Sequence, residues 1–105
     1  MQKVEHIGIA VKNLEASKKL FESLLNTSCY KVESVESEMV STAFFKVGDT
    51  KIELLETTNP EGAVGKFIEK RGEGLHHIAY EVADIHAEIK RLKAAGFVFT
   101  RQEPF

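Results

Sequence analysis

The chain of 105 residues is short enough to form one domain at most and long enough for one modest hydrophobic core. Hydrophobic residues make up 43% and charged residues 29%, and a net charge of −2 without a basic stripe gives nucleic-acid binding no support. No apolar run is long enough to span a bilayer, and no signal-peptide pattern opens the chain. Cys29 is the single cysteine, which excludes an internal disulfide, so we expect a cytoplasmic protein without membrane partners.

The first half of the chain predicts one helix among four strands. Asn13 is a suitable N-cap for the helix, and Gly48-Asp49 is typical of the turn between the last two strands. The predicted segments are a strand over 3–11, a helix over about 14–25, and strands over 29–35, 40–47 and about 50–56.

The second half predicts a short helical link followed by another strand, helix and strand. Asn59-Pro60 is expected to start the link, with asparagine as its cap and proline in its first turn, and Gly72 ends it. The segments that follow are a strand over 75–82, a helix capped by Asp84 and closed by Gly96, and a strand that begins over 97–100.

Two histidines open two copies of one strand-helix pattern. Residues 4–11 read VEHIGIAV and residues 75–82 read LHHIAYEV, and the caps Asn13 and Asp84 occupy equivalent places after them. An internal repeat of this kind indicates a duplicated supersecondary unit. A histidine at the same place in each copy predicts one site shared between the copies, most simply a metal site.

Alternation along the strands decides which histidine matches His6, because side chains two residues apart share a face. His6 shares its face with Gly8, whose lack of a side chain leaves room. His77 shares a face with Ala79, whereas His76 is expected on the opposite face. We therefore expect His77 to join His6. The alternative is that both are ordinary polar residues on a half-solvated sheet.

Glu53 is the third candidate ligand. It lies within the strand KIELLE, where an acid is costly unless it is paired or coordinates a metal. With two histidines nearby, a mixed nitrogen and oxygen site suits zinc, cobalt, nickel, manganese or iron, and three protein ligands would leave open positions for catalysis. The alternative is a surface carboxylate.

Three segments of the chain resemble methylmalonyl-CoA epimerases of the vicinal-oxygen-chelate (glyoxalase/bleomycin-resistance/dioxygenase) superfamily. They are residues 6–11, 48–56 and 70–80. The resemblance implies an α+β fold in which duplicated βαβββ modules form a curved, mostly antiparallel sheet with helices on its outer face. It implies a single domain over 1–105, with a first module over about 3–57, a link over about 58–73 and a partial second module over about 74–105.

The same resemblance implies an activity, a metal and partners. Methylmalonyl-CoA would be epimerised by abstraction of its α-proton through a metal-stabilised enolate. The family's metal contacts fall on His6, Glu53 and His77, the metal being cobalt, manganese, zinc or nickel. An acyl-CoA thioester is the expected partner, and a homodimer the expected assembly. A glyoxalase I-like isomerase and a non-catalytic, metal-dependent binding or resistance protein are the alternatives on this scaffold.

The resemblance does not assign a catalytic base within the chain. A glutamate that serves as a base in some members falls on Ser41, which is a poor base unaided, and Glu38 is a weak substitute. The family continues with two more strands, the last of which carries a glutamate that is both ligand and base. We therefore expect that residue beyond Phe105, with the second module incomplete and this sequence forming the larger part of such an enzyme.

Overall fold

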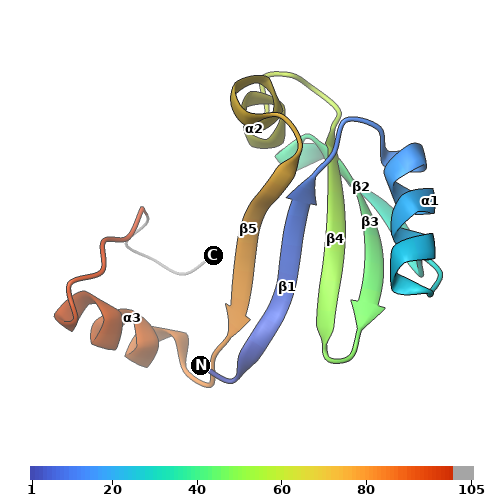
Figure 1. The fold of residues 1–105 in the computed structure, drawn as a ribbon. Helices are drawn as coiled ribbons and strands as arrows, with labels where there is room; N and C mark the ends of the chain where they lie inside the picture. The colour runs from blue at the N-terminus through green and yellow to red at the C-terminus, as the bar shows by residue number, and fades with distance from the viewer. Residues whose placement is uncertain (101–105) are drawn as a thin grey trace.

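The computed structural model describes residues 1–100, which form an open five-stranded sheet with helices around it (Figure 1). The elements in chain order are β1 (Lys3–Ala10), α1 (Leu14–Leu25), β2 (Lys31–Val35), the 3-10 helix η1 (Glu36–Glu38), β3 (Val40–Val47), β4 (Thr50–Thr57), α2 (Ala63–Arg71), β5 (Gly74–Glu81) and α3 (Ile85–Ala94). No helix among these is long and apolar enough to cross a membrane.

The sheet has the strand order β2-β3-β4-β1-β5. β1 runs parallel to β4, and every other neighbouring pair is antiparallel. The predicted mostly antiparallel α+β sheet is therefore confirmed. The two histidine-bearing strands, β1 and β5, are direct neighbours, so the two copies of the repeat meet edge to edge at the centre of the site described below.

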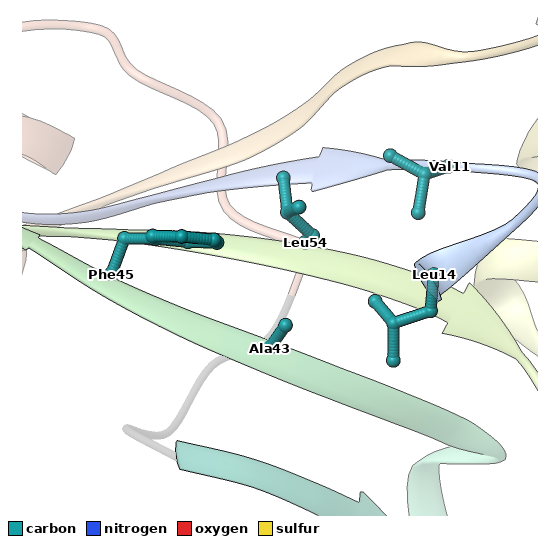
Figure 2. Close-up of a cluster of buried hydrophobic side chains, with 5 residues drawn as sticks. All are labelled: Val11, Leu14, Ala43, Phe45 and Leu54. Carbon is teal, nitrogen blue, oxygen red and sulfur yellow. The ribbon is translucent and has the colours of Figure 1, made fainter. Parts of the chain in front are cut away.

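One face of the sheet packs against α1 and holds the main core. Alternating residues of β1, β3 and β4 point toward the helix, and Phe45 and Leu54 are fully buried there. Figure 2 shows how side chains from these strands and the start of α1 converge. The buried cluster consists of Val11, Leu14, Ala43, Phe45 and Leu54.

Among residues 1–100, the opposite face is covered only at one end, by α2. There a second buried cluster joins the sheet to the helix; it comprises Ala10, Val40, Leu55 and Val64, with Phe67 and Ile68 packed against it. The rest of this face is left open beside the strands that carry His6 and His77. The main core thus occupies one face, and the candidate site lies on the other, beside the smaller cluster under α2.

The link helix begins later than its sequence predicts. α2 starts at Ala63 with Gly62 as its N-cap, rather than at Asn59-Pro60. Asn59 instead forms a turn, because its side-chain oxygen accepts the N–H of Glu61 at 2.9 Å and its carbonyl accepts the N–H of Gly62 at 2.9 Å. The side chain competes here with the helix for local backbone donors.

The strand expected over 97–100 does not form within the described residues. Phe97 donates its N–H back to the carbonyl of Leu92, and Val98 is 94% exposed. α3 has no buried residue and lies apart from the sheet rather than on its outer face (Figure 1). The expectations that concern Phe105 lie outside the described residues.

The start of α1 offers a test of its predicted cap. Asn13 accepts the N–H of Ala16 at 3.0 Å, as an N-cap should. Asn13→Ala is expected to lower the free energy of unfolding by about 1 kcal/mol, because that donor loses its partner. Asn13→Asp retains an acceptor oxygen and serves as the control in chemical denaturation. Equal stability of the alanine variant and the parent would show that the cap contributes nothing.

Candidate metal centre

The three residues expected to bind a metal are arranged around Gly8. In the sheet register, Gly8 lies opposite Glu53 of β4 on one side and His77 of β5 on the other. His6 lies two residues along β1 on the same face. A Cβ atom at Gly8 would overlap the His77 ring, so this ring lies over the bare backbone of Gly8. Glycine here permits the close approach of a side chain to the strand.

His6 makes contacts through both of its ring nitrogens. Its Nε2 lies 3.0 Å from Nε2 of His77, and the two rings meet edge to face. Its Nδ1 lies 2.6 Å from Oε1 of Glu5 and 3.4 Å from Oε2 of Glu53. Glu53 and His77 therefore approach His6 from different sides.

The one triad of donor atoms within 4.8 Å of one another in residues 1–100 is Glu5, His6 and Glu53. His77 is not a member of this triad, although its Nε2 contacts His6. The three residues predicted to bind a metal are thus gathered on one face, but their donor atoms do not all converge on one point in this arrangement.

Two register shifts between β1 and β5 bring in residues that the sequence pattern places elsewhere. β1 has one extra residue, Glu5, between Val4 and His6, and β5 has one extra residue, His76, where Gly8 is followed by Ile9. Extra residues of this kind interrupt strict alternation, as in a β-bulge. Glu5 comes to lie beside His6.

His76 is the clearest departure from the sequence prediction. It lines the same cavity as His77, so its expected place on the opposite face is wrong. Its Nδ1 lies 2.9 Å from Nδ1 of His77, and its ring meets the edge of Phe67 on α2. The doubled histidine was the available signal, but alternation alone assigned only one member to the site.

The electrostatic environment favours the metal-binding form of His77 and of Glu5, but burial opposes the charged form of Glu53. Burial lowers the pKa of His77, and the neighbouring His6 and His76 lower it further, so the imidazole is neutral near pH 7. Neutral imidazole is the form that binds metals. Burial raises the pKa of Glu53, and His6 opposes this shift. Hydrogen bonds from His6 and then Lys51 lower the pKa of Glu5.

The site opens into a cavity of about 840 Å³, which is large enough for a small-molecule ligand. Glu38, a candidate base, lines this cavity. Ser41 lies on the α1-facing side of β3 with Ala43, and its hydroxyl pairs with that of Ser34 at 2.9 Å. The neighbouring Thr42 lines the cavity instead and is 3% exposed.

The donor set suits a divalent ion. Two imidazole nitrogens 3.0 Å apart match the spacing of neighbouring ligands at right angles around an octahedral ion, each about 2.1 Å from it. Glu53 adds a carboxylate whose side chain is only 14% exposed. Nitrogen and oxygen donors of this kind suit zinc, cobalt, nickel or manganese.

A family model described as the Glyoxalase/Bleomycin resistance protein/Dioxygenase superfamily matches residues 5–105. An uncharacterised protein of Bacillus subtilis is 40% identical over 80 residues, which are 76% of this chain and 57% of the relative. An ethylmalonyl-CoA/methylmalonyl-CoA epimerase of Cereibacter sphaeroides is 36% identical over 95 residues, which are 90% of this chain and 71% of the relative.

Among solved structures, a variant of Streptomyces coelicolor methylmalonyl-CoA epimerase in complex with 2-nitronate-propionyl-CoA superimposes with a TM-score of 0.87 and 32% sequence identity. The match covers 100% of this chain and 77% of that one. The chain thus spans a little over half the length of the Bacillus subtilis relative and about three quarters of the Streptomyces enzyme.

Proposed function

The chain belongs to the Glyoxalase/Bleomycin resistance protein/Dioxygenase superfamily, and we propose that it acts as a metal-dependent methylmalonyl-CoA epimerase. One observation carries the proposal: the Nε2 atoms of His6 and His77, one from each copy of the repeat, lie 3.0 Å apart beside Gly8, and both residues line an open cavity. Relatives named as methylmalonyl-CoA epimerases, including one solved with methylmalonyl-CoA, support the choice of substrate.

In the proposed reaction, His6, Glu53 and His77 hold a divalent ion, which is cobalt, manganese, zinc or nickel. When bound, such an ion stabilises negative charge that develops on a thioester carbonyl oxygen as the neighbouring proton leaves. The apolar end of the cavity beside α2 shields the acyl group from water. Among the described residues, we propose Glu38 as an acceptor for the α-proton, since its side chain lines the cavity.

The proposal extends to partners and location. An acyl-CoA thioester is the small-molecule partner, in keeping with the complexes of related epimerases. A cytoplasmic homodimer is the proposed working form. The lone Cys29 is compatible with a reducing compartment, where unpaired thiols persist.

Exchange with solvent tests the activity directly. The protein is loaded with cobalt and incubated with methylmalonyl-CoA in heavy water, and the α position is followed by mass spectrometry. Deuterium should enter this position, because abstraction and return of the proton pass through solvent-exchangeable groups. No incorporation, together with turnover of glutathione thiohemiacetals, would favour a glyoxalase I-like isomerase. Neither activity, with retained metal, would favour a binding protein without turnover.

Glu53 should contribute less to metal binding than the two histidines. Glu53→Ala is expected to weaken metal affinity by at least about tenfold, or about 1.4 kcal/mol, because one oxygen donor is lost. Glu53→Gln should be milder, since the amide oxygen can still coordinate. Isothermal titration with zinc measures both, and Glu88→Ala on α3 is a matched control for loss of a carboxylate. Equal affinity in all these proteins would remove Glu53 from the ligand set.

A further inference from the structure

Each candidate metal-binding histidine has its other ring nitrogen occupied by the residue immediately before it in sequence. Nδ1 of His6 contacts Glu5, and Nδ1 of His77 contacts His76. We propose that Glu5 and His76 are positioning residues, which hold the Nδ1 proton of each histidine and present both Nε2 atoms to one metal ion. This inference rests on the proposed metal site.

The contact with Glu5 determines the tautomer of His6. An ionised carboxylate only accepts hydrogen bonds, so at 2.6 Å the proton must lie on Nδ1 of His6. Lys51 binds the other oxygen of Glu5 at 3.0 Å and stabilises its charge. In neutral His6, therefore, Nε2 carries the lone pair, and this is the atom that faces His77. Carboxylates that fix metal-bound histidines in this way are a common outer-shell device.

His76 performs the corresponding role for His77. Phe67 lies against its ring at a centroid distance of 5.0 Å, which fixes the ring from the side of α2. Two imidazole nitrogens 2.9 Å apart require one donor and one acceptor. When Nε2 of His77 binds an ion, its proton must lie on Nδ1, and Nδ1 of His76 accepts it. His76 then carries its own proton on Nε2.

The metal-free arrangement differs in the positions of two protons, one on His77 and one on His76. Two Nε2 atoms 3.0 Å apart need a proton between them, and His77 must supply it because His6 already donates to Glu5. Binding of an ion by these two nitrogens would require the proton to leave this position. By exchange with water, the proton of His77 moves from Nε2 to Nδ1, and that of His76 moves from Nδ1 to Nε2. No net proton is released, and only His77 and His76 change tautomer.

Nitrogen-15 spectra of the histidine rings test these assignments without any turnover. His6 should carry its proton on Nδ1 with and without zinc, whereas His77 should move its proton from Nε2 to Nδ1 when zinc is added. Glu5→Ala and His76→Ala should each weaken zinc binding by about 10- to 100-fold. Glu5→Gln retains an acceptor oxygen and should recover much of this loss. Glu88→Ala and His86→Ala, both on α3, are the matched controls.

The outcomes separate this inference from the proposed activity. A zinc-bound protein in which His6 is protonated on Nε2 overturns the inference, as do Glu5→Ala and His76→Ala variants that bind zinc as tightly as the parent. The predicted tautomers and affinity losses without deuterium incorporation support the inference and reject epimerisation by residues 1–105 with Glu38 as the base. A parent protein that binds no zinc rejects both.

Discussion

Replacement of either His6 or His77 by alanine is expected to lower the affinity for a divalent metal by more than about 100-fold. This loss should exceed the roughly 10- to 100-fold effect that is typical of removing an outer-shell residue, because a ligand atom itself is removed. The two rings come from different copies of the repeat, and their Nε2 atoms lie 3.0 Å apart. Each ring supplies its own donor atom, so neither can replace the other. Metal content after loading and dialysis, and titration calorimetry, measure the effect.

His86→Ala provides the control for loss of an imidazole, because His86 is exposed on α3, away from the sheet. Its metal affinity should equal that of the parent. His76→Ala should fall between the control and the two ligand variants, with its metal content retained at saturating concentrations. If His6→Ala and His77→Ala both hold as much metal as the parent, the shared site is refuted.

Gly8→Ala is expected to displace the ring of His77 and to reduce metal affinity by at least about tenfold, or about 1.4 kcal/mol. The reason is steric, since a methyl group at this position would occupy the space of the imidazole. Crowding of this kind also costs about 1–3 kcal/mol of stability when neighbours cannot move. The ring is on a flexible side chain at the open face, so we expect a stability loss near the lower end and a larger effect on metal binding.

A double-mutant cycle separates the steric cause from a general effect of alanine on β1. In the background of His77→Ala, the added methyl group meets no ring, so Gly8→Ala should cost little stability there. Chemical denaturation of the parent, both single variants and the double variant gives the coupling energy. Additive losses would mean that the His77 ring is not what excludes a side chain at Gly8.

Much of the fold follows from local patterns. The repeated VEHIGIAV and LHHIAYEV segments predict two equivalent strands, and the caps Asn13 and Asp84 begin the helices that follow them, as observed. Both cap side chains accept the backbone N–H expected of an N-cap. These features depend on covalent geometry and near neighbours in sequence, so they can be read without knowledge of the tertiary contacts.

By itself, the sequence also determined that His6 and Gly8 share a strand face, because side chains alternate with a period of two. Only the tertiary structure decided that Glu5 and His76 join them. Their places depend on register shifts between β1 and β5, strands that are far apart in the chain, and no local pattern specifies such a shift. Likewise, the segment over 97–100 has strand-forming residues but pairs with no strand among residues 1–100, and Phe97 donates its N–H to Leu92 instead. Strand propensity alone therefore does not form a strand, because it depends on packing against neighbouring strands.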